Sequence, residues 1–197
     1  MNQEKLQKNF NRHGFQTAFF QTKETAVDYL TGQIVGRTVG FGGSMTVREM
    51  GLFDALSAKN VCIWHHRVAG EETRQLATKA RIYVTSANAV SETGEIVNID
   101  GTGNRLAMTL YGPEKTYFVV GRNKITPDLA SAMDRAKNVA APKNAQRFKL
   151  KLPCAAKADR CYDCDSPERI CRATLILERV PNHLPIEILF IDEDLGY

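Results

Sequence analysis

The sequence predicts an α/β protein with three layers, in which helices cover both faces of a mostly parallel sheet. The first observation is that the short apolar runs Val61–Trp64, Ile82–Thr85 and Thr116–Val120 do not alternate with polar residues. Such runs are typical of strands buried on both faces. The second is that stretches with helical spacing of apolar residues separate these runs. At 197 residues, of which 43% are hydrophobic and 24% charged, the chain resembles one ordinary globular domain.

The first half of the chain is predicted to alternate helices with short strands. The helix over residues 22–33 is typical, because Ala26, Val27 and Leu30 fall on one side of it. The predicted elements in order are helices over 3–12 and 22–33, a strand over 34–39, helices near 45–51 and 52–58, a buried strand over 61–64, a helix over 71–79, and strands over 82–85 and 96–99.

The second half is predicted to continue the pattern and then to change character. Thr102 or Asn104 caps a helix through Leu110, a strand covers 116–120, and Thr126-Pro127-Asp128 begins a helix that runs to about residue 139. Residues 141–172 are predicted as a basic loop with cysteines, and strands over 173–180 and 186–191 are joined as a hairpin. We expect one domain, with residues 1–140 as the α/β core with its N-terminal helices. Residues 141–197, the Cys-rich loop and C-terminal strand pair, would complete it.

A glycine-rich turn follows the strand predicted over residues 34–39. The turn leads into a helix that either Ser44 or Thr46 can cap. Glycines let a backbone approach a ligand closely, and free N–H groups at a helix start attract phosphate or carboxylate. The same pattern also occurs as a tight turn without a ligand. The candidate ligand contacts here are Gly42, Gly43, Ser44 and Thr46.

A second polar region comprises the loop over residues 86–94, at the carboxyl end of the strand predicted over 82–85, and the run over residues 98–105 just beyond it. In open parallel sheets, ligands bind at such strand ends. The region is rich in amides, carboxylates and glycines, and Glu92 or Asp100 could serve as acid, base or nucleophile. The alternative is a polar turn in which Asp100 caps the backbone. The candidate ligand contacts in the run over residues 98–105 are Asn98, Gly101, Thr102, Asn104 and Arg105.

The runs Gly40–Thr46, Ala87–Asn98 and Gly101–Arg105 resemble the LUD (lactate utilization) domain, the family of lactate utilization protein C. The resemblance extends from about residue 20 to residue 197. It implies a fold similar to that of ribose-phosphate isomerase, glucosamine-phosphate deaminase and CoA-transferase. It also implies a part in oxidising L-lactate to pyruvate together with iron–sulfur partner proteins. The family's catalytic residues are not carried over, so the candidate residues above are positions in matching motifs.

Four of the five cysteines cluster in the basic segment with the pattern C-x6-C-x2-C-x6-C. Four thiolates within so short a stretch can wrap one metal ion or cluster, and nearby Lys and Arg residues would offset their charge. The spacing fits neither a zinc ribbon nor a [4Fe–4S] site uniquely, although a role in redox metabolism favours the cluster. Free thiols or a redox dithiol remain alternatives. The candidate metal ligands are Cys154, Cys161, Cys164 and Cys171.

Three functions are compatible with these patterns. The first is a component of a lactate-oxidising system that binds a small anionic ligand at the glycine loop and works with iron–sulfur redox partners. The second is a stand-alone isomerase or CoA-transferase-like enzyme. The third is a ligand or redox sensor without turnover.

Charge and hydropathy restrict the partners. Residues 141–172 hold eight basic and four acidic residues, an excess equal to the whole net charge of +4. No aromatic pattern typical of single-strand binding accompanies them, so we do not expect a nucleic-acid partner. The polar N-terminus lacks the apolar stretch of a signal peptide, and no apolar run approaches a membrane span. We therefore expect a cytoplasmic protein without a membrane partner.

Overall fold

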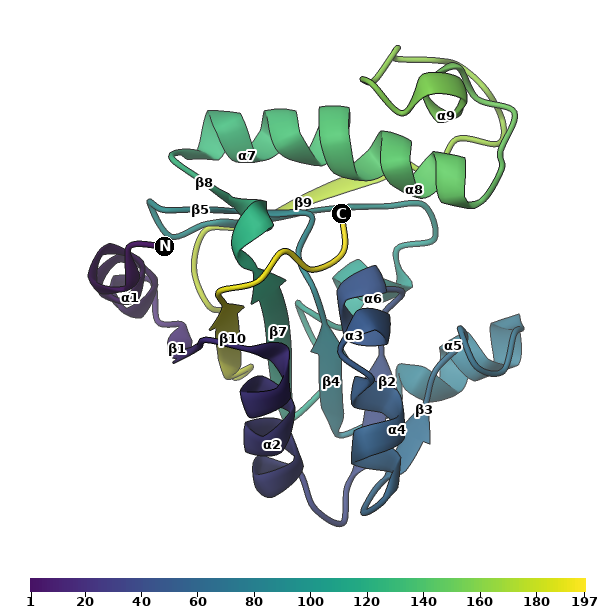
Figure 1. Ribbon diagram of the computed structural model, residues 1–197. Coiled ribbons are helices and arrows are strands. Elements are labelled where there is room, and N and C mark those ends of the chain that lie inside the picture. Colours follow the sequence, from purple (N-terminus) through teal and green to yellow (C-terminus); the bar gives the residue numbers. More distant parts are fainter.

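The computed structural model describes residues 1–197 and contains two sheets (Figure 1). Sheet A has six strands in the order β1-β10-β7-β4-β2-β3. Every neighbouring pair in it is parallel. Its strands are β1 (Gln16–Phe20), β2 (Thr38–Phe41), β3 (Val61–Ile63), β4 (Ile82–Thr85), β7 (Lys115–Gly121) and β10 (Ile186–Ile191).

Sheet B is smaller and mixed, with four strands in the order β8-β5-β6-β9. The β5–β6 and β6–β9 pairs are antiparallel, whereas β5 and β8 are parallel. Its strands are β5 (Ala89–Ser91), β6 (Ile96–Asp100), β8 (Ile125–Thr126) and β9 (Ala173–Leu177).

Several helices begin at side chains that accept a hydrogen bond from a backbone N–H group of the first turn, as N-cap residues do. Asn2 and Thr22 cap α1 and α2, and Ser44 and Asp128 cap α3 and α7. The helical segments are α1 (Gln3–Arg12), α2 (Lys23–Gln33), α3 (Met45–Glu49), α4 (Leu52–Ser57), α5 (Glu71–Ala77), α6 (Asn104–Ala107), the 3-10 turn η1 (Arg122–Lys124), α7 (Leu129–Arg135), the π turn η2 (Ala136–Ala140), α8 (Ala141–Arg147) and α9 (Pro153–Lys157).

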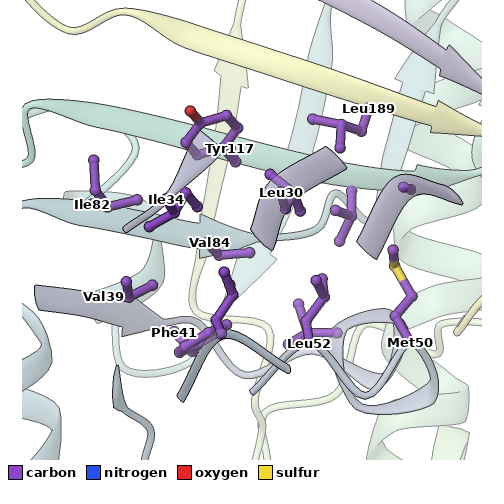
Figure 2. Packing of buried hydrophobic residues seen from close by; sticks show 14 of the residues in the cluster. Leu30, Ile34, Val39, Phe41, Met50, Leu52, Ile82, Val84, Tyr117 and Leu189 are labelled. Carbon is purple, nitrogen blue, oxygen red and sulfur yellow. The ribbon is translucent and has the colours of Figure 1, made fainter. Parts of the chain in front are cut away.

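One face of sheet A packs against α2, α3 and α4. Leu30 of α2 and Leu52 of α4 belong to one buried cluster with Val39 of β2, Val84 of β4 and Leu189 of β10 (Figure 2). All five of these side chains are fully buried. Removing this much apolar surface from water is the main force that holds the layer to the sheet.

The opposite face of sheet A is covered by α1 and sheet B. The alternation of a strand sends neighbouring side chains to opposite faces, so Tyr117 and Val119 of β7 join the first core while Phe118 and Val120 join the second. The second core also contains Phe10 of α1. Helices α7 and α8 run end to end over the far side of sheet B (Figure 1). The prediction of a three-layer α/β fold with a mostly parallel sheet is confirmed.

Several strands in the first part of the chain differ from the prediction. The strand placed at 34–39 is β2, Thr38–Phe41, because Ile34 closes α2 through its N–H bond to Leu30 and packs beneath that helix. Strand β3 is an edge strand with Val61 exposed, so it is not buried as predicted. Strands β1 and β5 were not predicted at all.

The second part of the chain holds four further corrections. The helix predicted to begin at Thr102 or Asn104 and run through Leu110 is the short α6, Asn104–Ala107, and its N-cap is Gly103, which has no side chain to cap it. The N-cap of α7 is Asp128, since Thr126 belongs to β8. Residues 141–172 are not only loop, because α8 continues the helix through the π turn and α9 follows it. The last two strands form but do not pair as a hairpin, since β9 joins sheet B and β10 lies inside sheet A between β1 and β7. No helix has the length and apolar character needed to cross a bilayer.

Candidate functional site

The larger of two main cavities lies at the carboxyl ends of the sheet A strands. Its walls come from the loops that follow β2, β4 and β7, from the turn after β6, and from α8. Its volume is about 350 Å³, which lies at the lower end of the range typical of small-molecule sites. We call it the strand-end cavity. It occupies the position at which open parallel sheets bind ligands.

The glycine loop forms one wall of the strand-end cavity. Gly43 and Ser44 line the cavity, whereas Gly42 lies behind it. A Cβ atom on Gly42 would stand 2.6 Å from Oγ1 of Thr85 and 3.0 Å from Cγ of Arg105. Gly42 is therefore required by the close packing of its neighbours. Ser44 accepts the N–H of Val47 at 3.2 Å, so its hydroxyl is used at least partly as a helix cap.

Lys124, in the 3-10 turn after β7, closes the bottom of the strand-end cavity and is almost fully buried. Its ammonium nitrogen donates to Oγ1 of Thr46 at 2.7 Å, Oγ of Ser86 at 2.9 Å and the carbonyl of Ala87 at 3.1 Å. No carboxylate forms a salt bridge with it. Burial, with the charges of Arg135 and Arg105, lowers the pKa of Lys124 to about 7.

Arg105 and Asp100 form a partly buried pair that also lines the strand-end cavity. The Arg105 Nε lies 3.2 Å from Oδ2 of Asp100, and its Nη2 donates to the carbonyl of Ile99 at 2.6 Å and to Oδ1 of Asn88 at 3.2 Å. Burial would raise the pKa of the Asp100 carboxyl, but Arg105 and the N–H groups of Gly103 and Thr102 outweigh it, so that pKa is lowered. Asp100 is thus an ionised anchor that holds the turn and the guanidinium.

Two adjacent histidines line the cavity beside the glycine loop. Burial lowers the pKa of His65, and the same effect with nearby positive charges lowers the pKa of His66 to about 4. Both rings are therefore neutral at pH 7. Adjacent residues of a strand would point to opposite faces, but these two lie in the turn after β3 and so share one face. The Nδ1 of His65 is buried and has no hydrogen-bond partner.

Two arginines add positive charge to the mouth of the strand-end cavity. Arg147 of α8 is held by Oδ1 of Asn144, at 3.1 Å from Nε and 2.8 Å from Nη2, and it stacks on Phe148. No carboxylate pairs with it. Arg74 of α5 lies 3.1 Å from Glu71. The cavity therefore carries four cationic side chains against one carboxylate, which Arg105 already neutralises.

The structure brings together only part of the residues singled out in the sequence. Thr46 and Asn98 lie behind the wall: Thr46 accepts from Lys124, and Oδ1 of Asn98 accepts the N–H of Asn88 at 3.0 Å. Glu92 does not line the cavity and pairs with Lys5 of α1 at 2.6 Å. The predicted residues that line the cavity are Gly43, Ser44, Asp100, Gly101, Thr102, Asn104 and Arg105.

The sequence model of the LUD domain matches residues 3–191, nearly the whole chain. The chain belongs to the LUD domain family. None of the curated proteins matches it. A crystal structure of a DUF162 family protein from Deinococcus radiodurans, at 1.70 Å resolution, is similar with a TM-score of 0.54 at 11% identity, and covers 95% of this chain and 94% of that one. At this identity the likeness shows the fold alone.

The LUD domain contains a second cavity, of about 220 Å³, under α8 and α9. All four clustered cysteines line it, and none of them forms a disulfide. Burial, reinforced by the neighbouring thiols, raises the pKa of Cys154. The fifth cysteine, Cys62, lies in β3 away from this cavity. We call it the cysteine cavity; its lining cysteines are Cys154, Cys161, Cys164 and Cys171.

Several functional candidates of this LUD domain are not evident in the sequence. Lys124 stands among 26 Lys and Arg residues, and only its burial distinguishes it. One signal was present, because Gly121–Lys124 follows a strand that ends at the same edge as the glycine loop. Asn144 and Arg147 were assigned to a loop, so no pattern placed them over the strand ends.

Proposed function

We propose that the strand-end cavity of this LUD domain binds a small metabolite that carries a carboxylate or phosphate group. The observation that carries the proposal is Lys124, a buried amine that lines the cavity and forms no salt bridge with a carboxylate. A buried charge without a counterion costs several kcal/mol in general. An anionic ligand group at Lys124 would supply the missing counterion.

The rest of the lining supports an anionic ligand. Arg147 and Arg74 lie at the mouth, so they attract an anion before it reaches Lys124. Asn88, Asn104 and the neutral histidines offer donors and acceptors that orient the polar groups of a metabolite. A guanidinium stays charged at all physiological pH values, which keeps the mouth attractive to anions.

We infer a part in L-lactate utilization, with lactate or pyruvate as the ligand and iron–sulfur proteins as partners. Family membership supports this inference, as does a cavity whose charge suits a small carboxylate. Lys124 could also hold or release a proton at Nζ near neutral pH, since its pKa is about 7. An isomerase or CoA-transferase reaction has less support, because Glu92 lies outside the cavity and Asp100 is neutralised by Arg105.

The experiment is calorimetric titration of the full chain with lactate, pyruvate and inorganic phosphate. We expect at least one to bind, and Lys124→Met to weaken that ligand by tenfold or more, which is about 1.4 kcal/mol. Lys143→Met is the matched control. Lys143 is an exposed residue of α8, four residues before Arg147, and it does not line the cavity. Its affinity should equal that of the wild type.

Proton linkage provides a second readout of the same site. An anion beside Lys124 stabilises the ammonium and raises its pKa, so binding above pH 7 takes up a proton. The binding enthalpy should then differ between buffers of different ionisation enthalpy, and affinity should fall as the pH rises above 7. If no anion binds, or if Lys124→Met and Lys143→Met behave alike, the proposal is wrong.

A further inference from the structure

We propose that the cysteine cavity is the binding site of a [4Fe–4S] cluster, with Cys154, Cys161, Cys164 and Cys171 as its ligands. The four thiols come from α9, from the loop after it and from the segment before β9, and they surround one space. Each would bind iron as a thiolate and release its proton. The proposal goes beyond the binding of an anion in the strand-end cavity and does not depend on it.

The size of the cysteine cavity favours a cluster of several atoms. Its volume of about 220 Å³ is several times the roughly 30 Å³ that one water molecule takes up in the liquid. A single Zn²⁺ ion needs four sulfurs about 2.3 Å from one point. A cubane places iron and sulfide between the thiolates, so its ligands stand around a wider space.

The charges around the cysteine cavity suit a cluster ligated by four thiolates, which is anionic. Lys137, Arg169 and Arg172 line the cavity, against the single carboxylate of Asp163. Positive charge close to thiolates favours the deprotonated form that binds metal. Three cations against one carboxylate would thus offset the charge of the bound cluster.

Hydrogen bonds to sulfur are already in place on two of the four ligands. The Arg169 Nη2 donates to Sγ of Cys171, and the backbone N–H of Asp163 donates to Sγ of Cys161, both at 3.4 Å. Such bonds hold cluster ligands and tune their potential. The Nε of Arg169 is buried without a partner. An inorganic sulfide of the cluster would supply the missing acceptor.

The cysteine cavity adjoins the strand-end cavity. Ile99, Ala141 and Ile170 line both, so only single side chains separate the two spaces. A cluster in one would therefore lie beside a ligand in the other. When bound, a [4Fe–4S] cluster can accept or donate one electron, which would suit a protein that acts in lactate oxidation.

The test is anaerobic purification of the full chain, followed by reconstitution with ferrous iron and sulfide. We expect about four irons and four sulfides per chain, broad visible absorption from thiolate-to-iron charge transfer, and a paramagnetic signal after reduction by dithionite. Serine variants of Cys154, Cys161, Cys164 and Cys171 should lose most of this iron while their circular dichroism shows a folded chain. Cys62→Ser, the matched control, should keep all of it.

Three outcomes would overturn the proposal. They are one zinc per chain without iron, a folded chain that takes up neither metal, or cysteine variants that retain as much iron as Cys62→Ser. Lys124→Met separates this proposal from the function proposed above. The Lys124→Met variant should lose anion affinity and keep its full iron content. If Lys124→Met lost its iron while the four cysteine variants kept theirs, the cysteines would not be the ligands.

Discussion

Burying Lys124 costs folding free energy, and the same residue is the proposed ligand contact of the strand-end cavity. Its three N–H donors match three oxygen acceptors, from Thr46, Ser86 and Ala87, so its hydrogen bonds are complete although it forms no salt bridge. An apolar residue would be cheaper to bury at this position. A protein keeps such a cost where function needs it.

The depressed pKa of Lys124 predicts how stability depends on pH. The folded pKa is about 7, whereas an unfolded lysine titrates near 10.4. Between these values the unfolded chain binds more protons, so this group makes stability rise with pH, by up to about 1.4 kcal/mol per pH unit. Below pH 7 both states are protonated and the slope vanishes. Urea unfolding from pH 6 to 9 should show this rise in the wild type relative to Lys124→Met, and parallel curves would contradict it.

Gly42 is expected to tolerate no side chain. An added Cβ would lie 2.6 Å from Oγ1 of Thr85 and 3.0 Å from Oη of Tyr83. Gly42→Ala should therefore destabilise the protein by about 1–3 kcal/mol, the usual cost of overpacking, as measured by urea unfolding. Gly32→Ala is the control, because Gly32 is inside α2 with nothing near the added atom. That variant should be neutral or more stable by up to about 1 kcal/mol. Equal losses in both would disprove the packing argument.

At the level of helices and strands, the sequence predicted those elements that form because of their own local residue pattern. Strands β4 and β7 were found because their residues are apolar without a break, and α2 because Thr22 caps a helix with an apolar side. Strand β1 was missed because a mixed run, Gln16–Phe20, becomes a strand only by pairing with β10, more than 160 residues away in the sequence. The false hairpin has the same cause, since a short connection does not show that its strands belong to different sheets.

The candidate site was likewise predictable only where a local motif marks it. Arg105 and Gly43 stand in dense motifs that mark strand-end loops, and the structure places both on the cavity wall. Glu92 stands in such a motif too, but the turn that holds it faces α1, where Lys5 pairs with it. Arg147 reaches the cavity only because α8 continues across sheet B. No local sequence pattern predicts that Arg147 lies there.

The π turn η2 is expected to order the cysteine segment. It presents Asn138, whose Oδ1 accepts the N–H of Cys161 at 2.9 Å and whose Nδ2 donates to Asp134 at 2.7 Å. Asn138→Ala should cost about 1 kcal/mol of local stability. Hydrogen exchange at the Cys161 amide should then be about fivefold faster in the metal-free chain. Gln146→Ala, an exposed change on α8, should leave it unchanged. Unaltered exchange in Asn138→Ala would contradict this anchor.

At the scale of the whole molecule, the sheet topology brings the N-terminal strand β1 and the C-terminal strand β10 together with β7 in sheet A. Strand β10 lies between β1 and β7, so the first strand has no other partner in sheet A. The strand-end cavity and the cysteine cavity then flank one wall, made by β6, α8 and the segment before β9. Pairing over such long sequence separations must complete before either cavity exists.

Phe190 tests this dependence on β10. Its side chain is fully buried, with its ring centroid 5.4 Å from that of Phe10 in α1 and 5.3 Å from that of Phe19 in β1. Phe190→Ala should cost about 3–5 kcal/mol of unfolding free energy, because it removes a large core side chain and leaves a cavity. Hydrogen exchange should speed up first at the β1 amides, which only β10 holds. Tyr111→Ala, an 85% exposed position, should change stability by less than about 0.5 kcal/mol. If β1 stayed as protected as β4 in Phe190→Ala, β10 would not be what secures the N-terminal strand.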